Sequence, residues 1–494
     1  MSKTSIAIVG GGTAGWMAAN LLAKRWANHV EITVIESPNI GIIGVGEGST
    51  PALKQFFETL AIPDEQWMPA CHATYKTNIT FAGWSPSSGI CRYGHPFVSQ
   101  TDTLVERAFY VNCLTRRLGL SVNTQPEQFF LNGWLADAKL APIAPANFPF
   151  DMAYGYHFDS ALLGQFLQRH ALSLGAHYKA AEVADVQLKV DGRIDSLRFN
   201  DGQRFKADLY IDCTGLSSKL LQQALQVPFQ SFSDNLFNDA AVVAPTAALD
   251  PCPVETMATA ATAGWFWQIP LQHRTGNGYV YSSSFLSADA AETEFRQKLG
   301  LLDADITCRH LAFKTGQVKY HWHKNCLALG LAQGFIEPLE ATALHLVQGA
   351  VELFIDLFQQ GQFSTHYQAK YNTIISERFA GVRDYIVGHY QLNTIQDKGY
   401  WAENRHNPHI SANLQHILRV WRQGGDLMAL FNTQRNASHF GNASWHCLLA
   451  GYGEFKPLAA KQPLEQHDMF ILNNLTRFFN GCLLNFAKPQ SRFL

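Results

Sequence analysis

The sequence predicts an α/β fold followed by a mostly helical C-terminal region, and three observations support this prediction. An apolar strand, a glycine-rich loop, an apolar helix and a second strand follow one another within the first 37 residues. Further strand-like segments that end near glycine recur as far as Phe335. Beyond about residue 365, apolar residues at helical spacing dominate, as in ISANLQHILRVW.

The composition is that of a large globular protein. The chain has 494 residues, of which 47% are hydrophobic and 16% charged, enough for more than one core unit. A net charge of −2 without a basic block predicts neither nucleic acid nor an anionic membrane as partner. The N-terminal MSKTSIAIVGGG lacks the pattern of a signal peptide, and no 18-residue apolar run predicts a transmembrane helix. The nine scattered cysteines favour a reduced, cytoplasmic setting.

The first glycine loop has the spacing of a dinucleotide-binding turn. The predicted strand Thr4–Val9 leads into Gly10, Gly12 and Gly15, which form G-x-G-x-x-G. The first glycine permits the tight turn, the second lets the backbone approach a pyrophosphate, and the third lets helix and strand pack closely. A β–α turn without a ligand is the alternative interpretation.

The residues after this loop complete the predicted unit. Thr13 and Ala14 open the helix, so its N-terminus would face the phosphates. Glu36 ends the second strand, 21 residues after Gly15, where an acid can accept hydrogen bonds from ribose hydroxyls. Strand, loop, helix and acid together favour dinucleotide binding over an empty turn.

Other segments predict that the dinucleotide is FAD. In a second glycine-rich loop, the backbone at Gly46, Gly48 and Ser49 could lie against a flat ring or an anion, before a helix with Thr50 as N-cap and Pro51 at its first position. The strand ADLYIDCTG, with Asp212, and the segment LALGLAQGF, with Gly334, are typical of strands that return to a flavin. No second glycine fingerprint for NAD(P)H is present.

We therefore predict an FAD-binding Rossmann-like fold of the flavin monooxygenase type. The predicted FAD domain is discontinuous over residues 1–370, with β-sheet substrate-side insertions at about 75–150 and 225–320. Residues 371–494 are predicted to form a mostly helical region that covers the substrate.

Three places have residues that an FAD fold does not require. In YKTNITFAGW, strand-like alternation would turn Lys76, Asn78 and Thr80 to one side, with Lys76 beside apolar neighbours, although a surface lysine is the commoner case. In EPLEATALHL, Glu340 at a helix start is explained by helix capping or by function. In AGWFWQIPL, alternation would turn Trp265 and Trp267 to the same side, as core packing or as a rigid wall. The cluster HWHKNC has no second half, so we predict no metal site.

These motifs together resemble the flavin-dependent halogenases of the tryptophan/indole type, over nearly the whole chain. G-W-x-W-x-I-P at Gly264–Pro270 is specific to that group, Lys76 matches its catalytic lysine, and Glu340 in EPLEAT matches its catalytic glutamate. The resemblance implies that a separate reductase supplies reduced FAD, which generates hypohalous acid from oxygen and chloride or bromide. The halide would lie at the amides of Thr342 and Ala343, and Lys76 would hydrogen-bond the oxidant or trap it as a haloamine.

The resemblance also bears on the substrate. His95 and Phe97 match positions that sandwich an indole ring. The chain departs from the family pattern in two places: Ala341 replaces a serine, and Ser444 with Trp445 replaces an aromatic pair that holds the amino-acid part of tryptophan. An indole without that part is therefore the favoured substrate. Trp265 and Trp267 would keep it away from the flavin.

Two other functions stay open at the level of sequence. A single-component aromatic hydroxylase would reduce its own FAD with NAD(P)H, and a non-catalytic FAD-binding redox protein would have no use for both Lys76 and Glu340. The sequence does not fix the native substrate, the ring carbon attacked or the preferred halide. It does not fix the oligomeric state either, and a homodimer is compatible with the sequence.

Overall fold

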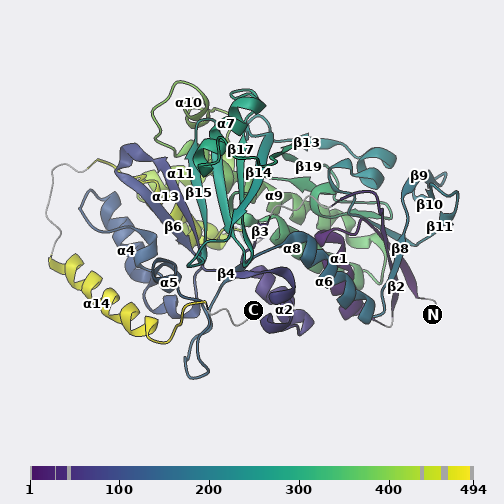
Figure 1. The fold of residues 1–494 in the computed structure, drawn as a ribbon, viewed down its shortest axis with the longest axis horizontal. Helices are drawn as coiled ribbons and strands as arrows, with labels where there is room; N and C mark the ends of the chain where they lie inside the picture. Colours follow the sequence, from purple (N-terminus) through teal and green to yellow (C-terminus); the bar gives the residue numbers. More distant parts are fainter. Residues whose placement is uncertain (1–2, 28, 42–45, 434–438, 458–465, 490–494) are drawn as a thin grey trace. The chain divides into compact units, whose positions relative to one another are not determined.

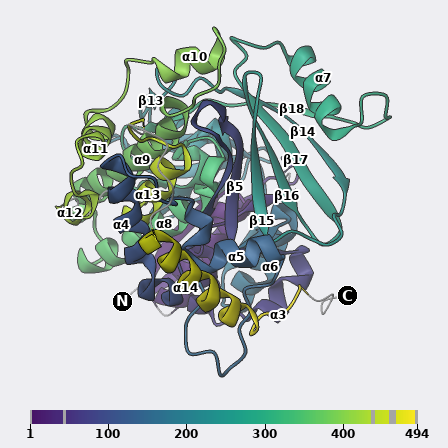
Figure 2. The same ribbon diagram turned by 90° about the vertical axis from the view of Figure 1, so that its left-hand side faces the viewer.

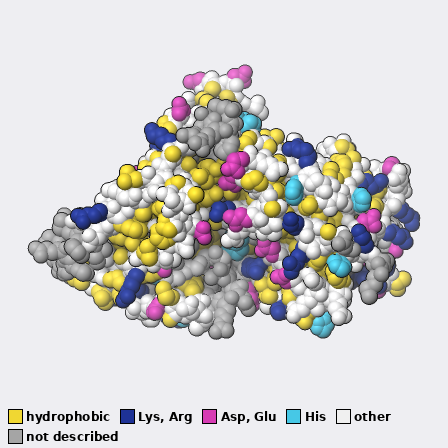
Figure 3. All heavy atoms as spheres, turned by 90° about the horizontal axis from the view of Figure 1, so that it is seen from below, with side chains coloured by type: hydrophobic (Ala, Val, Ile, Leu, Met, Phe, Trp, Pro, Cys, Tyr) yellow, Lys and Arg dark blue, Asp and Glu magenta, His cyan; other side chains and the backbone are white. Residues whose placement is uncertain are grey.

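The structure, a computed structural model, describes residues 3–27, 29–41, 46–433, 439–457 and 466–489, and the chain divides into two compact units. Unit 1 comprises Met1–Cys71, Phe158–Ser233 and Phe313–Ala380, and unit 2 comprises His72–His157, Asp234–Ala312 and Gly381–Leu494. On the face drawn in Figure 3, Lys and Arg side chains lie among Asp and Glu side chains and form no continuous basic area.

A six-stranded sheet of order β20-β21-β12-β1-β2-β8 is the centre of unit 1. Its strands are β1 (Thr4–Val9), β2 (Val30–Glu36), β8 (His177–Ala180), β12 (Leu209–Asp212), β20 (Trp322–His323) and β21 (Cys326–Ala328). All neighbours pair in parallel except β20 with β21. Parallel strands are buried on both faces, which explains the apolar and buried run Ile6–Val9 in β1. The predicted α/β, Rossmann-like fold is confirmed.

Three helices of unit 1 pack side by side: α1 (Thr13–Trp26), α6 (Ser160–Ser173) and α8 (Ala343–Gln360) (Figure 1). The buried Asn20 of α1 donates hydrogen bonds to the carbonyl oxygens of Trp16 and Leu167, both at 2.8 Å. This satisfied amide joins α1 to α6 without leaving a buried polar group unpaired. Asn20 therefore ties α1, the helix that follows the glycine loop, to α6.

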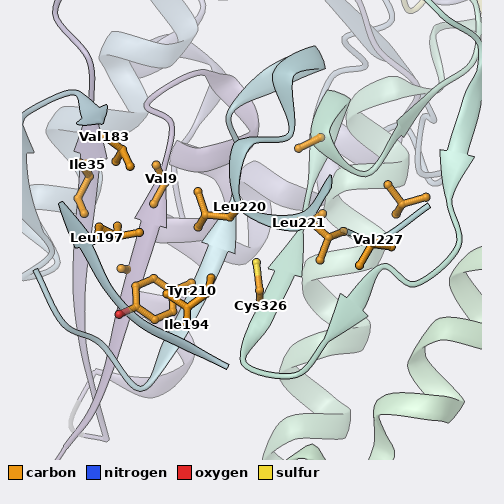
Figure 4. Close-up of a cluster of buried hydrophobic side chains, with 14 of the residues drawn as sticks. Val9, Ile35, Val183, Ile194, Leu197, Tyr210, Leu220, Leu221, Val227 and Cys326 are labelled. Carbon is orange, nitrogen blue, oxygen red and sulfur yellow. The ribbon is translucent and has the colours of Figure 1, made fainter. Parts of the chain in front are cut away.

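The remaining elements of unit 1 are shorter. The helix α2 (Ala52–Leu60) starts one residue later than predicted, with Pro51 as its N-cap residue. Two three-stranded sheets accompany the main one, and their strands are β9 (Val183–Leu188), β10 (Ile194–Phe199), β11 (Arg204–Phe205), β13 (Phe229–Ser231), β19 (Gly316–Val318) and β22 (Gly334–Phe335). Figure 4 shows side chains of β9 and β10, among them Val183 and Leu197, packed with Val9 and Tyr210 of the main sheet.

Among the helices of the described residues, the one over Leu339–Gln360 is long and apolar enough to cross a membrane, with a mean hydropathy of 1.4. In the structure, 61% of the most apolar 18-residue stretch of this helix is buried inside the protein. Phe354, Ile355 and Phe358 of α8 all lie in the core. A buried core helix has the same composition, and α8 is a core helix of unit 1.

A seven-stranded sheet of order β18-β14-β17-β16-β15-β5-β6 is the centre of unit 2. Its strands are β5 (Asn78–Ser85), β6 (Ile90–Pro96), β14 (Ala240–Ala247), β15 (Glu255–Ala261), β16 (Gly264–Pro270), β17 (Arg274–Tyr281) and β18 (Arg309–Ala312). The helix α7 (Ala288–Leu299) covers one face of it (Figure 2). On that face Phe295 packs with Phe266 and Tyr279. Because β16 lies inside the sheet, its residues meet neighbours on both sides.

The strand predicted from Tyr75 to Trp84 is interrupted. Residues Thr74–Lys76 form β4, which pairs with β7 (Gly155–Phe158), whereas β5 joins the large sheet. Between them, the amide of Thr77 donates to the carbonyl of Val254 at 2.7 Å. The chain therefore changes its pairing partner at Thr77, and the expectation that Lys76, Asn78 and Thr80 face the same side stays a prediction.

The C-terminal part is helical, as predicted. Its helices are α9 (Gln368–Gln391), α10 (Tyr400–Arg405), α11 (Ala412–Arg422), α12 (Leu427–Thr433), α13 (Asn442–Gly451) and α14 (Gln466–Leu483). Unit 2 also contains α4 (Glu106–Arg117) and α5 (Leu131–Ala138). The indole nitrogen of Trp401 donates to the Ala261 carbonyl at 2.8 Å, which ties α10 to β15.

A buried carboxyl group in unit 2 predicts a pH-dependent stability. Asp102 accepts hydrogen bonds from the amides of Ser99 (2.7 Å) and Leu131 (2.8 Å), yet burial raises its pKa to about 7. A carboxyl whose pKa is raised on folding stabilises the protein at low pH, and this contribution is lost as the pH rises through about 7. This contribution is fully present below about pH 4 and is lost by about pH 7, so between pH 6 and pH 8 its last part should appear in urea denaturation as a fall in the stability of the parent relative to Asp102→Asn.

The variant Asp102→Asn isolates this group because it cannot titrate. It loses one accepting oxygen and is expected to be less stable than the parent at pH 6. Its stability should change less between the two pH values. An equal pH slope for the parent and the variant would assign the dependence to other groups.

Candidate active site

The glycine loop at Gly10–Gly15 is sterically specified. Gly10 has φ of 115°, and a Cβ atom there would lie 2.1 Å from the carbonyl oxygen of Cys213. A Cβ atom at Gly15 would lie 2.0 Å from the Gly10 carbonyl oxygen. Both positions therefore exclude any side chain, for the reasons that the sequence pattern indicates: a tight turn and close packing of α1 on β1.

Gly12 differs from its two neighbours in the motif. A Cβ atom there would meet no atom within 4 Å, and Gly12 is the N-cap residue of α1 without a side-chain cap. The helix N-terminus, with Thr13 and Ala14, thus opens onto free space, while the Thr13 hydroxyl turns back to the Ser160 carbonyl at 3.3 Å. Such an end, with its amides and helix dipole, fits the pyrophosphate of FAD.

Glu36 lies over the same loop. A Cβ atom at Gly11 would be 2.2 Å from the carboxyl carbon of Glu36, so the acid lies directly against the glycine backbone. Burial raises the pKa of Glu36, and a hydrogen bond with Tyr178 partly opposes this shift. The acid at the end of β2 therefore lies against the glycine loop, and its contact with a ribose stays a prediction.

The carboxylate of Asp212 is engaged by its own chain. It accepts hydrogen bonds from Thr214, through both hydroxyl (2.6 Å) and amide (3.0 Å), and from the amides of Leu220 (2.9 Å) and Leu221 (2.8 Å). Burial raises its pKa, against these bonds. Asp212 thus organises the turn after β12, and its predicted contact with FAD stays a prediction.

The other glycines predicted at the cofactor also lie in unit 1. Gly334 lies in β22, where a Cβ atom would be 2.6 Å from the Gly316 carbonyl oxygen and 2.8 Å from the Phe379 ring. Gly46 has φ of 86°, Gly48 belongs to the short strand β3 (Glu47–Gly48), and Ser49 is buried. Residues 42–45 of this second glycine-rich loop lie outside the described residues.

The segment before α8 is strained at the predicted catalytic glutamate. Glu340 has φ of 70° and Ala341 has φ of 54°, two consecutive left-handed residues that are not glycine. Both belong to the short 3₁₀ turn Leu339–Ala341, and Thr342 follows as the N-cap residue of α8 without a side-chain cap. Each left-handed residue of this kind costs about 1 kcal/mol or more and persists where surroundings fix it. Glu340 itself is buried.

Lys76 is fully buried in unit 2, with an exposed fraction of 0%. Its ammonium nitrogen lies 5.5 Å from the centroid of the Phe97 ring, within the range of a cation–π contact. His95 is also buried, in β6 opposite Ile79 of β5. The structure therefore brings together Lys76, His95 and Phe97, three residues that the sequence analysis selected separately.

An aromatic cluster extends from His95. The ring of Tyr385, in the unit 2 part of α9, lies 6.0 Å from His95, 3.7 Å from Phe440 and 5.0 Å from Trp445, between ring centroids. The stack of Tyr385 on Phe440 is nearly parallel, at 8°. Sequence reasoning selected His95 and Trp445 but missed Tyr385 and Phe440, since nothing in the spacing of these residues marks them as neighbours.

Trp265 and Trp267 lie on the same face of β16, as the alternation predicted. Their ring centroids are 6.1 Å apart, and Phe266 between them packs on the opposite face under α7. A Cβ atom at Gly278 of β17 would be 2.1 Å from the Trp267 ring, so the indole lies flat on a bare strand. The two indoles form a rigid, buried wall.

The indole nitrogen of Trp267 is buried and has no hydrogen-bond partner among the residues that the structure describes. Trp267→Phe removes this N–H group and also shrinks the buried ring, so we expect a loss of stability that comes from the smaller ring alone. Trp84→Phe is the matched control, because it shrinks the ring in the same way but also removes a hydrogen bond: the Trp84 nitrogen donates to the Ala258 carbonyl at 3.1 Å. Thermal denaturation should show a loss that is larger by about 1 kcal/mol for the control. Equal losses would contradict the assignment.

The His/Cys segment HWHKNC has a structural explanation. The Nε2 atom of His321 lies 3.2 Å from the Ser376 hydroxyl, and the ring stacks on Phe379 at 5.4 Å. Burial lowers the pKa of His321 to about 3, so the ring is neutral. Across residues 3–489, where they are described, no group of three or more His, Cys, Asp or Glu side chains could hold a metal ion.

The parallel sheet, the glycine loop and the acid on β2 define an FAD-binding α/β protein. The sequence profile described as "Tryptophan halogenase" matches residues 5–464. The tryptophan 6-halogenase of Streptomyces toxytricini is 35% identical over 425 residues, 81% of this chain and 80% of that protein. A tryptophan 7-halogenase of Lentzea aerocolonigenes is 31% identical over 491 residues, 91% and 89% of the two chains.

Solved structures agree with this relationship. The crystal structure of the S. toxytricini enzyme matches with a TM-score of 0.87 and 30% identity, over 100% of this chain and 99% of that chain. A flavin-dependent halogenase from Xanthomonas campestris matches with a TM-score of 0.86 and 31% identity, over 99% and 97%. The chain belongs to the tryptophan halogenase family.

Proposed function

We propose that this flavin-dependent halogenase transfers chlorine or bromine to an indole that lacks the amino-acid group of tryptophan. The observation that supports the site is the burial of Lys76 beside the Phe97 ring, next to His95 on the neighbouring strand. Burial of a lysine ammonium among aromatic side chains costs desolvation free energy. Proteins keep such costly buried groups mainly at functional sites.

The residues of unit 1 are assigned to cofactor and halide. The amides at the start of α1 hold the pyrophosphate, and Glu36 accepts hydrogen bonds from a ribose. Bound FAD, reduced by a separate flavin reductase, supplies the electrons with which oxygen converts halide to hypohalous acid. The backbone amides of Thr342 and Ala343, at the N-terminus of α8, hold the halide ion, which the helix dipole favours.

The residues of unit 2 are assigned to the aromatic substrate. His95 and Phe97 stack on the indole and present one ring carbon, which replaces random encounter by a fixed geometry. Trp265 and Trp267 keep the aromatic substrate apart from the flavin. Trp445, which is buried against Tyr385, and Ser444, whose carbonyl accepts from the Tyr385 hydroxyl at 2.9 Å, support a substrate without a zwitterionic group.

The halogen transfer is an electrophilic aromatic substitution. The ring carbon forms a bond to the halogen of the hypohalous acid, and the oxygen–halogen bond breaks. In one route the Lys76 ammonium hydrogen-bonds the departing hydroxide oxygen and gives it a proton, so that it leaves as water. In the other, the Lys76 amine first takes the halogen from the hypohalous acid and releases water, and the ring carbon then takes the halogen from this haloamine while the nitrogen regains a proton. The ring carbon then loses its proton, a step assigned to the Glu340 carboxylate.

Mass spectrometry of an indole panel tests the proposal. The protein is incubated with FAD, a flavin reductase, NADH and oxygen, with chloride and bromide in parallel. We expect products heavier by one halogen in place of one hydrogen, and more product from indole than from free tryptophan. Products that gain oxygen, formed with NADH in the absence of reductase, would favour an aromatic hydroxylase. Absence of any product across the panel would favour a non-catalytic FAD-binding protein.

A further inference from the structure

A buried histidine joins four segments of unit 2 around the strand of Lys76. His157 of β7 is completely buried. Its Nδ1 atom lies 3.2 Å from the hydroxyl of Thr74 on β4, and its Nε2 atom lies 2.8 Å from the hydroxyl of Thr256 on β15. The Thr74 hydroxyl in turn donates to the carbonyl of Pro270, the last residue of β16, at 2.7 Å.

These bonds fix the tautomer of the imidazole. A threonine hydroxyl has one hydrogen, and that of Thr74 points at the Pro270 carbonyl. The Thr74 oxygen must therefore accept from His157, so Nδ1 has the proton. The Nε2 lone pair then accepts the hydroxyl hydrogen of Thr256. Both ring nitrogens are thus used, and the imidazole has no free lone pair with which to take a proton.

His157 and Lys76 are neighbours on one face of the β4–β7 pair. Thr74 lies opposite His157, and Lys76 lies opposite Gly155, in an antiparallel register. Diagonal partners of this kind are within reach of long side chains. Burial and the positive charge of Lys76 hold the pKa of His157 well below its usual range. The Cys252 thiol, which is hydrogen-bonded to Thr74, is a further titratable group beside these residues. Burial raises the pKa of this thiol to about 11.

The hydrogen bonds of His157 with Thr74 and Thr256 also connect the segment of Lys76 to the strand of the two tryptophans. Pro270 ends the strand that contains Trp265 and Trp267, and Thr256 belongs to the adjacent strand β15. The side-chain amide of Gln272 donates a hydrogen bond to the Ala73 carbonyl at 2.8 Å. The backbone amide of Gln272 donates to the His72 carbonyl at 3.2 Å. The segment before Lys76 is therefore fastened along the end of the β16–β17 hairpin.

We propose that His157 is a positioning residue for Lys76. Its neutral imidazole, through two hydrogen bonds, fixes the position of Lys76 relative to the strand of Trp265 and Trp267. This inference rests on the proposed function of Lys76. The imidazole bonds both threonines at once, which neither an aliphatic nor a phenyl side chain can do. As it stays uncharged, it fixes β4 without placing a second cation beside Lys76.

The test uses full-length protein and the halogenation assay. We expect His157→Phe to lower kcat roughly 10- to 100-fold, as displacement of a catalytic group by about 1 Å does. Bound FAD should stay unchanged, since His157 lies outside the glycine-loop unit. The alkaline limb of the pH–rate profile should shift, because the environment of the Lys76 ammonium changes. His157→Gln, which can donate and accept, should recover part of the rate.

Thr275→Val is the matched control. Thr275 is fully buried in β17 and donates to the Ala247 carbonyl at 3.0 Å, so its replacement costs one comparable hydrogen bond. It should lower thermal stability without changing kcat or the pH profile. If His157→Phe lowers the melting temperature but keeps the parent kcat and pH profile, or if Thr275→Val slows the reaction equally, the inference is overturned. A parent protein that makes no halogenated product instead overturns the proposed function.

Discussion

Replacement of Lys76 by methionine is expected to abolish halogenation while FAD binding and the fold remain. Methionine keeps the unbranched, apolar stem of lysine and removes the nitrogen that would bind or trap the oxidant. Because Lys76 is completely buried, the substitution also removes a buried charge, and the free energy of unfolding should not fall. We expect a loss of at least about 10³-fold in product formation, the scale for loss of a central catalytic group.

The measurement is halogenated product per unit of bound flavin, so that loss of cofactor and loss of chemistry are separated. Lys189→Met is the control, because Lys189 is exposed in unit 1 and should give the parent rate. Lys76→Arg separates the two routes: guanidinium donates hydrogen bonds but is a poor halogen acceptor because it stays protonated. Product at near-parental rate from Lys76→Met would remove the mechanistic basis of the proposal.

The cofactor side of the protein was predictable from sequence because its constraints are local. Gly10, Gly12 and Gly15 lie within one turn, and the steric requirement of each follows from backbone geometry. The strand Thr4–Val9 was predicted with the bounds that the structure gives, since the buried part of a parallel central strand is apolar without interruption. Fold class and the helical C-terminal region were predictable for the same reason: periodicity is a property of neighbouring residues.

The substrate side was less predictable because long-range pairing builds it. His157 meets Thr74 only through the β4–β7 pair, and Tyr385 meets Phe440 across more than 50 residues of chain. The change of pairing partner at Thr77 depends on Val254, far away in sequence. No local pattern encodes such contacts. Lys76 itself was selected by resemblance, since periodicity alone left it as a surface lysine.

The left-handed turn at Glu340 and Ala341 was also beyond sequence reasoning. The pattern predicted a glutamate at a helix start, which a helix dipole favours in ordinary helical geometry. The structure instead places Glu340 in a strained turn before Thr342. Such strain is maintained by surrounding structure, and no residue type in EPLEAT announces it. The predicted roles of Glu340, Thr342 and Ala343 stay proposals that rest on family membership.

The second large effect is expected at Gly10, with Gly12 as its matched partner. In Gly10→Ala the new methyl group would overlap the Cys213 carbonyl oxygen at 2.1 Å, and φ of 115° is unfavourable for alanine. Neither the backbone of β1 nor that of the turn after β12 can yield easily. We expect a loss of more than about 4 kcal/mol in the free energy of unfolding, the range of severe backbone and packing defects. Little folded protein should form.

Gly12→Ala makes the same chemical change with the opposite expectation. Gly12 has φ of −72°, which alanine adopts freely, and its Cβ atom would meet nothing within 4 Å. The apoprotein should fold with the parent melting temperature. If the pyrophosphate of FAD occupies that space, the methyl group will block its approach, and the Kd for FAD should rise roughly 10- to 100-fold, about 1.4 kcal/mol per decade.

Calorimetric titration of FAD into the apoproteins of the parent and of Gly12→Ala measures this change in Kd. Thermal scans with and without FAD measure the stabilisation that follows from binding. The parent should gain a higher melting temperature from FAD than Gly12→Ala does at the same concentration. Equal FAD affinity of Gly12→Ala and the parent would show that the space before α1 is not where the pyrophosphate lies. A stable, folded Gly10→Ala would contradict the steric account of the loop. The two variants make the same chemical change where backbone conformation and nearby atoms oppose a methyl group at Gly10 and allow one at Gly12, so they separate the requirement of the fold from the requirement of the cofactor.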